Sequence, residues 1–171
     1  MNNSENRPRI RLAELADAEA IRNIYNHYVL NSTCTFQTQP ESPEDRLTWL
    51  RNHGETHPVV VAEWNGEIVG WGSLSPWNSR CAYSRTVEAS IYIHHDQHRK
   101  GIGLVLLEDL VARAKAAGHH TMIGGACTEQ EASLGLQERL GFRRVALFRE
   151  VGFKFGRWLD VAYAQLMLQS G

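Results

Sequence analysis

The chain has 171 residues, of which 43% are hydrophobic, and a formal net charge of -1 at pH 7. This length supports one substantial hydrophobic core and is short for two, so we predict a single domain over residues 1–171 with a flexible segment at residues 1–9. The near-neutral charge excludes a global attraction to nucleic acid or to an anionic membrane, so neither is expected as a partner.

Cysteine usage and hydropathy favour a cytoplasmic protein. The three cysteines are widely spaced, which supports neither a disulfide framework nor a structural zinc site. The sequence shows no signal peptide, and no apolar run is long enough to cross a bilayer. Small anions are therefore expected as ligands rather than polymers or lipid surfaces.

The first part of the chain predicts a strand and a helix. A short strand is expected at residues 10–13. A helix is expected at residues 17–30 because apolar residues recur there at helical spacing: Ala20, Ile21, Ile24, Tyr25, Tyr28 and Val29. Residues 31–40 have turn composition around Phe36, an aromatic side chain that belongs either to the core or to a pocket wall, with the core as the default.

A second helix and a hairpin follow. Ser42 can cap a helix that begins at Pro43, with Asp45 as the acid three residues after the cap. Apolar runs at 58–64 and 68–74 are separated around Asn65-Gly66, the pattern of an antiparallel hairpin.

The loop at residues 75–85 is rich in arginine and aromatic residues. A guanidinium such as that of Arg80 can bind a carboxylate bidentately, which would suit an amino-acid ligand. The alternative is a surface loop whose long side chains lie along the protein with their polar ends in water.

Residues 86–93 predict a half-buried strand. Its apolar residues alternate with more polar ones, so one face carries Val87, Ala89, Ile91 and Ile93. Glu88 then lies on the opposite face together with Ser90 and Tyr92. A carboxylate in the middle of a strand, away from the core, is a candidate for chemistry.

A basic loop and a Gly-x-Gly turn come next. Arg99 and Lys100 precede Gly101 and Gly103, and a helix is expected from Leu104 to Gly118. Its core-facing stripe is expected to comprise Leu104, Leu107, Val111 and Ala114, widened by Leu110 and Ala117. The free amides at a helix N-terminus attract anions, and glycines let a phosphate approach them. The pattern lacks the Gly-Lys-Ser/Thr of a P-loop and the third glycine of a dinucleotide site. An ordinary strand-to-helix turn is the alternative.

The remaining elements predict a strand at 121–126, a helix at 131–140, and strands at 143–153 and 161–168 joined by a turn at 154–158. The order of elements predicts a mixed α/β domain in which antiparallel hairpins meet a crossover unit built around the central helix.

Several motifs carry a resemblance to a known family. The stretch from Glu88 through Gly103, the helix after it, Ala126 and EQEASLGLQERLGF are similar to the GCN5-related N-acetyltransferase (GNAT) superfamily. SPWNSRCAYSRTVEASIYI and GFKFGRWLDVAYAQL, with Thr35-Phe36 and Pro40, resemble its phosphinothricin and methionine sulfoximine N-acetyltransferase group. The similarity covers nearly the whole chain.

This resemblance implies a central, mostly antiparallel sheet flanked by helices, with a V-shaped cleft for acyl-CoA. Acetyl-CoA is the implied co-substrate, with its pyrophosphate at the Gly-x-Gly turn and no metal. The residues implied for its binding are Ile91, Tyr92, Ile93, Arg99, Lys100, Gly101, Ile102, Gly103, Leu104, Gln130 and Ser133.

The implied activity is acetylation of the α-amine of a small amino acid or a glutamate-like analogue. Glu88 is the expected general base, because the ammonium must lose a proton before it attacks. Pairing of this carboxylate with Arg80 or Arg85 is the structural alternative. The residues expected to contact the substrate are Phe36, Asn78, Ser79, Arg80, Tyr83, Glu88, Ala89 and Ser90.

Three residues depart from the family pattern. His98 occupies the first position of the Gln/Arg-x-x-Gly-x-Gly motif, and Gln130 replaces an asparagine that usually contacts CoA. Gln137 stands where relatives carry a tyrosine or histidine that is thought to protonate the departing thiolate. A glutamine cannot be a general acid, so this step would pass to water, to another side chain or to nothing.

Further expectations concern metal, assembly and function class. His94, His95 and His98 share one loop, but we expect no metal because that loop is assigned to phosphate. A homodimer is expected because close relatives are dimers and because Phe155 and Trp158 would be exposed on a monomer. The alternative functions are acetylation of a protein N-terminus or a polyamine, and a non-catalytic acyl-CoA sensor.

Overall fold

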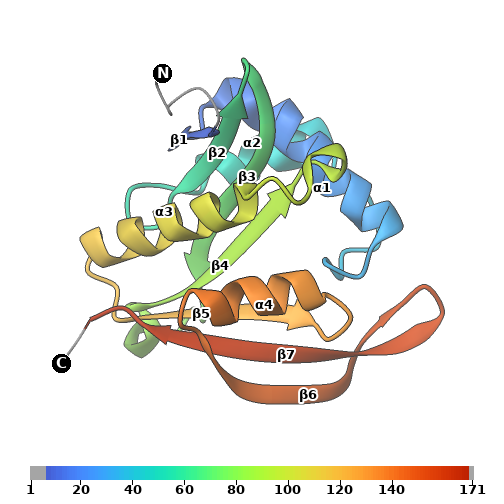
Figure 1. Ribbon diagram of the computed structural model, residues 1–171, viewed down its shortest axis with the longest axis vertical. Coiled ribbons are helices and arrows are strands. Elements are labelled where there is room, and N and C mark those ends of the chain that lie inside the picture. Colours follow the sequence, from blue (N-terminus) through green and yellow to red (C-terminus); the bar gives the residue numbers. More distant parts are fainter. Residues whose placement is uncertain (1–6, 170–171) are drawn as a thin grey trace.

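The computed structural model describes residues 7–169, and their strands form one seven-stranded sheet in the order β1-β2-β3-β4-β5-β7-β6. Helices flank this sheet (Figure 1). Strands β4 and β5 pair in parallel, and the other five neighbouring pairs are antiparallel. The expected mixed α/β fold with a mostly antiparallel sheet is confirmed. Of the segment expected to be flexible, residues 1–6 lie outside the described residues, and Arg9 already begins β1.

The predicted strands and helices are all present, with small shifts at their ends. The strands are β1 (Arg9–Leu12), β2 (Val59–Trp64), β3 (Glu67–Pro76), β4 (Thr86–Ile93), β5 (Thr121–Cys127), β6 (Arg143–Lys154) and β7 (Arg157–Met167). The α-helices are α1 (Ala18–Asn31), α2 (Pro43–Arg51), α3 (Ile102–Ala116) and α4 (Glu131–Arg139). The expected cap of α2 is confirmed, because the Asp45 amide donates to Ser42 Oγ at 3.1 Å.

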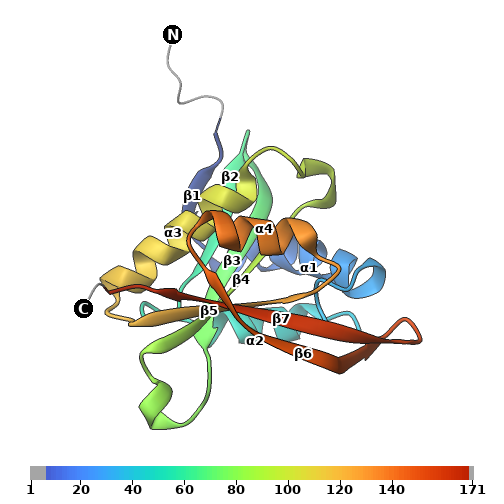
Figure 2. The same ribbon diagram turned by 60° about the horizontal axis from the view of Figure 1, so that its bottom comes forward.

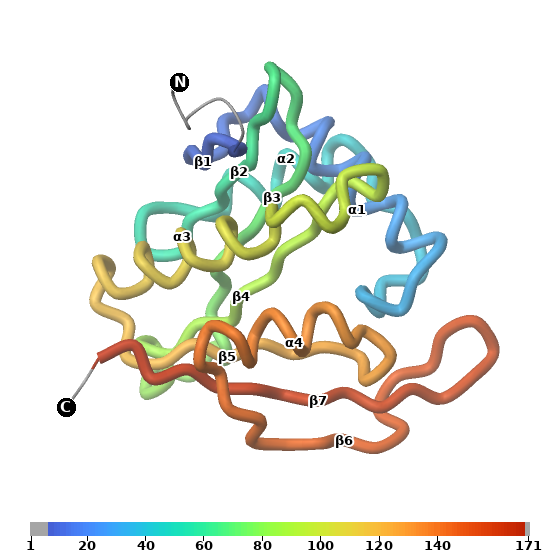
Figure 3. The backbone as a smooth tube through the Cα atoms, in the orientation of Figure 1, coloured from blue at the N-terminus to red at the C-terminus, as the bar shows by residue number. Residues whose placement is uncertain are grey.

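Two tight turns close the hairpins of the sheet. Asn65 and Gly66 have φ angles of 53° and 81°, and they join β2 to β3 as the sequence predicts. Phe155 and Gly156 have φ angles of 52° and 74° and join β6 to β7. The turn expected at 154–158 is therefore too long, since two left-handed residues suffice to reverse the chain. Figure 3 shows the long β6–β7 hairpin along the edge of the sheet.

The sheet carries a hydrophobic core on each face. On one face α3 packs across β3, where a Cβ at Gly72 would lie 2.9 Å from Leu110, so glycine permits the close approach. On the other face α1 and α2 pack around Trp71, which is 2% exposed. Strand β4 divides its side chains between the two cores: Val87 is buried in the first, and Tyr92 packs against the second. The alternation predicted for this strand is confirmed.

The buried face of α3 differs from the expected one. The helix begins at Ile102, and its buried residues are Ile102, Leu106, Leu107, Leu110 and Ala114. Leu104 and Val111, which were expected in the core stripe, are only half-buried. The helix starts two residues before the predicted position, and steps of four residues from Ile102 trace the face that meets the sheet.

Across residues 7–169, none of the helices combines the length and the apolar character needed to cross a bilayer. Cys34, Cys81 and Cys127 are free thiols, half-buried, exposed and buried in that order.

Candidate functional site

Strands β4 and β5 pair over three residues and then separate. The parallel register joins Thr86–Glu88 to Thr121–Ile123, and from Ala89 onward β4 pairs with β3 alone. Figure 1 shows the two strands diverging toward their carboxyl ends. The separation opens a V-shaped cleft in the sheet, as expected, and Glu88 lies at its apex as the last residue of β4 that pairs with β5.

Two adjacent cavities occupy this cleft. The inner one, which we call the Cys34 cavity, has a volume of about 60 Å³ and lies between β4, β5 and α4. The outer one, the Gly101 cavity, has a volume of about 520 Å³ and lies between the end of β4, the start of α3 and α4. Residues that line both cavities are Cys34, Ile91, Tyr92, Gln130, Ser133 and Leu136.

The Gly101 cavity gathers nearly all the residues expected to bind the cofactor. Those that line it are Ile91, Tyr92, Ile93, Arg99, Gly101, Ile102, Gly103, Leu104, Gln130 and Ser133. Lys100 is the exception, since its Nζ donates to Gln97 Oε1 at 2.7 Å on the exposed side of the loop. Residues that lie far apart in the sequence, on β4, at the start of α3 and near α4, thus line a single cavity.

The N-terminus of α3 is built to receive an anion. Gly101 is the N-cap residue, with a φ angle of 78°, and no side chain caps the helix. Arg99 also has a left-handed φ, of 64°, and lines the same cavity. Because the first amides of a helix have no partner within it, they and the helix dipole attract negative charge at this point.

Tyr28 supports the loop before α3, a role that the sequence did not indicate. Its hydroxyl lies 2.6 Å from His98 Nε2 and donates to the carbonyl oxygen of Ile93. Tyr28 and His98 both line the Gly101 cavity. The helical spacing of Tyr28 suggested a core residue, and its hydroxyl partners lie some 65 to 70 residues away in sequence. His98, the first departure from the family motif, is therefore held by a specific contact.

Glu88 is an unpaired, half-buried carboxylate. Burial raises the pKa of its carboxyl above the ordinary value for glutamate. Within residues 7–169 no ion pair involves Glu88. Arg85 instead donates to the carbonyl oxygen of Gly118 at 2.9 and 3.1 Å. The alternative in which Arg80 or Arg85 pairs with Glu88 is wrong, and the carboxylate is free to take a proton.

Gln137 projects a buried amide into the cleft. Its side chain is 8% exposed and lines the Cys34 cavity, and its Oε1 has no hydrogen-bond partner among the described residues. A Cβ at Gly124 would lie 2.6 Å from Gln137 Nε2, so the amide packs on the backbone of β5. This amide can donate or accept a hydrogen bond, but it has no proton to release at neutral pH.

Four of the residues expected to contact the substrate lie on the loop between β3 and β4 and are exposed to solvent. Asn78, Ser79, Arg80 and Tyr83 are exposed, and none of them lines the two cleft cavities. Figure 2 shows this loop projecting from the body of the molecule. By contrast, Ala89 and Ser90 line the Cys34 cavity. The structure therefore brings only part of the expected substrate set to the cleft.

Phe36 packs against the β6–β7 hairpin. Its ring is half-buried and lies so close to Gly152 that any Cβ there would overlap it. The side chain is part of the packing between the α1–α2 loop and β6, and it does not line either cleft cavity.

The loop after α1 is held in place by hydrogen bonds from residues far away in the sequence. Lys154, 4% exposed, donates to the carbonyl oxygens of Ser32 and Thr35 at 2.7 and 2.8 Å. Gln130 Nε2 donates to Thr33 Oγ1 at 3.0 Å. These contacts hold Cys34 at the wall shared by the two cavities, and no local pattern in the sequence predicts them.

Histidines gather near the entrance of the cleft. Potential ligand atoms of His94, His95 and Asp96 lie within 4.8 Å of one another, and His27 stacks on His95 at 3.9 Å. His95 and Asp96 are exposed. The expectation of no metal stays a prediction, because the same side chains could offer ligands.

Comparison with known proteins identifies the family. A model of the acetyltransferase (GNAT) domain matches residues 10–163. The chain belongs to the GNAT family of acetyltransferases. The resemblance carried by the motifs around Glu88 and Gly101 is thereby confirmed, together with the expectation that the protein is an enzyme.

Similar proteins can be aligned with this chain over nearly its whole length. An L-amino acid N-acyltransferase of Escherichia coli is 40% identical over 93% of both chains. A phosphinothricin N-acetyltransferase of Streptomyces coelicolor is 38% identical over 86% of this chain and 88% of its own. An acetyltransferase of Salmonella typhimurium, solved with its cofactor acetyl-CoA, is 38% identical with a TM-score of 0.93, covering 97% of this chain and 96% of its own.

Proposed function

We propose that this GNAT enzyme transfers the acetyl group of acetyl-CoA to the α-amine of a small amino acid or of a glutamate-like analogue such as phosphinothricin, methionine sulfoximine or methionine sulfone. The observation that carries this proposal is Glu88, an unpaired and half-buried carboxylate at the apex of the cleft. The activities for which the relatives are named support the same acceptor class.

Acetyl-CoA is assigned to the cleft on chemical grounds. Its pyrophosphate would lie against the free amides of α3 near Gly101 and Gly103, beside Arg99. Pantetheine would then follow the unpaired edge of β4 from Ile93 toward Ala89, because that edge offers backbone groups after β5 departs. This path brings the thioester to the Cys34 cavity, next to Glu88.

The reaction needs one proton acceptor and one carbonyl-polarising group. Glu88 takes the proton of the ammonium, directly or through water, and the free amine attacks the thioester carbon. A backbone amide of β4 stabilises the oxyanion while the C–N bond forms. The C–S bond then breaks, and the nitrogen releases its second proton as the amide forms. The CoA thiolate leaves and takes up a proton through water, because Gln137 has none to give.

The acceptor would contact Ala89 and Ser90 in the cleft and Phe36 at its side. Asn78, Ser79, Arg80 and Tyr83 would reach it from the β3–β4 loop. Since this loop is exposed, we propose that it contributes by moving toward the cleft when the amino acid binds.

The function is tested with purified protein, acetyl-CoA and a panel of amines. Release of free thiol with amino acids or their glutamate-like analogues is expected, at a rate well above that without amine. Thiol release with polyamines or N-terminal peptides alone would favour the alternative acceptors. Tight CoA binding without any turnover would favour an acyl-CoA sensor.

We also propose a homodimer formed through the β6–β7 hairpin. This edge of the sheet exposes a row of large apolar side chains: Val145, Leu147, Phe148, Val151, Phe153, Phe155 and Trp158. Trp158 is 61% exposed and lies against Phe153 at 5.0 Å. A cytoplasmic location is proposed as well, because acetyl-CoA is an intracellular metabolite.

Sedimentation velocity at micromolar concentration tests the dimer. The wild type is expected to sediment as a dimer, and Trp158→Glu as a monomer, because a buried unpaired carboxylate disfavours the interface. Leu12→Glu, which places a carboxylate at a comparably exposed apolar residue on β1 at the opposite edge of the sheet, serves as the control. A monomeric wild type would contradict the proposal.

A further inference from the structure

A third cavity lies on the face of β4 that α1 and α2 cover. It has a volume of about 130 Å³ and we call it the Arg46 cavity. Its lining residues come from α1, α2, β3, β4 and the segment before α2: Tyr25, Glu41, Arg46, Trp49, Trp71, Ser73, Ser75, Ser90 and Tyr92. Ser90 and Tyr92 also line the Cys34 cavity, so the two cavities share a wall.

The register of the sheet places this cavity beside Glu88. Residues that face each other across an antiparallel pair project to the same side. Ser75 is the direct partner of Glu88, and Ser73 is the direct partner of Ser90. The wall of the Arg46 cavity therefore continues along β3 and β4 to the carboxylate that we propose as the base.

Buried hydrogen-bond donors without partners line this cavity. Arg46 and Trp71 are each 2% exposed, and Arg46 Nε and Trp71 Nε1 have no hydrogen-bond partner among the described residues. The hydroxyls of Ser73, Ser75 and Ser90 add further polar groups. Unsatisfied buried donors cost stability, and a ligand with acceptor atoms would satisfy them.

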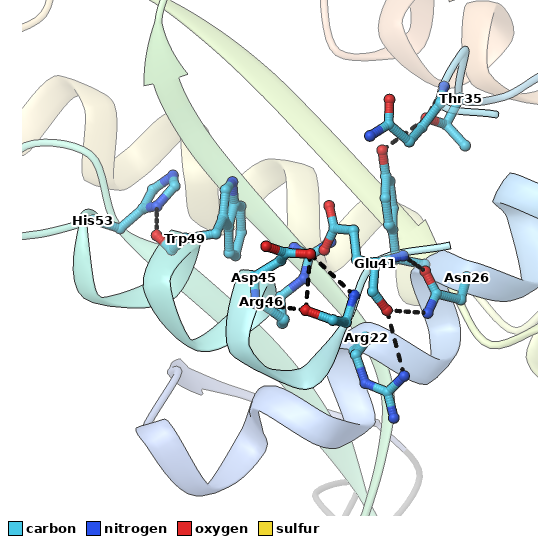
Figure 4. Close-up of polar contacts among 11 residues, drawn as sticks. Arg22, Asn26, Thr35, Glu41, Asp45, Arg46, Trp49 and His53 are labelled. Atoms are coloured by element: carbon cyan, nitrogen blue, oxygen red, sulfur yellow. Dashed lines mark hydrogen bonds and ion pairs between the residues drawn. The ribbon is translucent and has the colours of Figure 1, made fainter. Parts of the chain in front are cut away.

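The guanidinium of Arg46 already has a counter-ion. Its Nη2 lies 2.7 Å from Glu41 Oε2, and its centre lies 4.7 Å from the Tyr25 ring and 4.3 Å from the Trp49 ring. Figure 4 shows Arg46, Glu41 and Trp49 in this arrangement. The pair has no net charge, so an anion that entered the cavity would meet no surplus of positive charge.

Glu41 is held in place through its backbone. Asn26 Nδ2 donates to the carbonyl oxygen of Glu41 at 3.0 Å, and the Glu41 amide donates to Asn26 Oδ1 at 2.9 Å (Figure 4). This two-way contact with α1 fixes the residue from which the carboxylate extends. The counter-ion of Arg46 is therefore a built feature of the cavity and not a mobile surface side chain.

We propose that the Arg46 cavity receives the end of the acceptor's side chain. Among the acceptors named above, it selects those with an uncharged group that has strong hydrogen-bond acceptors, such as a sulfone, sulfoxide or amide, over those with an anionic group, such as the phosphinate of phosphinothricin. The cavity volume corresponds to about four water molecules, and thus to a similar number of non-hydrogen atoms. This inference rests on the proposed function, because it places the α-amine at Glu88 while the side chain extends past Ser75 and Ser90.

Two matched pairs of substrates separate charge from hydrogen bonding. Glutamine and glutamate differ in charge at nearly equal size, and methionine sulfone differs from methionine by its two acceptor oxygens. In the wild type, kcat/KM is expected to be at least about tenfold higher for glutamine than for glutamate, and for methionine sulfone than for methionine.

Each of two substitutions in the cavity should lower a different one of these ratios. Glu41→Gln leaves Arg46 with a surplus charge, so the glutamine-to-glutamate ratio should fall by about tenfold or more. Trp71→Phe removes one donor and keeps a ring, so the ratio of methionine sulfone to methionine should fall about tenfold. A partly unfolded sample lowers both members of a pair equally, so each ratio reports the active fraction alone.

Glu63→Gln is the matched control, because Glu63 forms an ion pair with Arg11 on β1 and lines none of the three cavities. Its ratios should equal those of the wild type. Unchanged ratios in both Glu41→Gln and Trp71→Phe would overturn the proposal for the cavity while the acetyltransferase function stands. Failure of the wild type to acetylate any amino acid would instead overturn the proposed function.

Discussion

Replacing Glu88 with Gln is expected to lower kcat by about 10² to 10⁴-fold while the dissociation constant for acetyl-CoA stays unchanged. The amide keeps the size of the side chain but cannot accept the ammonium proton at the apex of the cleft. Stopped-flow or steady-state assays of thiol release measure the rate, and calorimetric titration with CoA measures binding. Turnover equal to that of the wild type would remove Glu88 as the base.

The pH dependence gives this prediction a second readout. Burial raises the pKa of Glu88, so its proton is retained at a higher pH than in an ordinary glutamate. The acidic limb of kcat/KM should therefore lie above the ordinary titration range of glutamate and should disappear in Glu88→Gln.

The same shift has a consequence for stability. The folded chain binds the Glu88 proton more tightly than the unfolded chain, so this group makes the free energy of unfolding decrease as pH rises through its titration. Glu88→Gln should therefore not lower the melting temperature at neutral pH. Its loss of activity would then report on the chemistry.

Replacing Arg46 with Met is expected to lower the free energy of unfolding by about 3 to 5 kcal/mol, measured by urea denaturation. The substitution leaves the carboxylate of Glu41, which is 19% exposed, without its cation at 2.7 Å. It also removes a guanidinium that lies within 5.1 Å of the ring of Trp71.

A double substitution distinguishes the broken ion pair from a simple packing defect. Arg46→Met combined with Glu41→Gln should recover part of the lost stability, because no charge is then left buried alone. Arg51→Met, at an exposed position of the same helix, should change the free energy of unfolding by no more than about 0.5 kcal/mol. A loss that is the same in the single and double variants would contradict the electrostatic explanation.

Local patterns in the sequence predicted the helices and strands. They also predicted the part of the site formed by the strand with Glu88 and the Gly-x-Gly turn. Apolar periodicity, the cap at Ser42 and the turn at Asn65-Gly66 are properties of neighbouring residues, so they can be read before folding. The strand with Glu88 and the Gly-x-Gly turn lie within some 16 residues of each other, and the structure places both along one cleft. The family motifs span the same short segments.

The tertiary structure decided which of these residues meet, because contacts between distant segments leave no local signal. The sequence allowed an ion pair between Glu88 and Arg80 or Arg85, and only the folded positions show that neither arginine pairs with it among the described residues. The same holds for the Lys154 contacts to the loop after α1 and for the cavity around Arg46. The sequence by itself determined the family, the strand that carries the carboxylate and the anion site. The packing of α1 and α2 on β3 and β4 decided what surrounds that carboxylate, because burial and unpaired hydrogen-bond donors arise only when those elements come together.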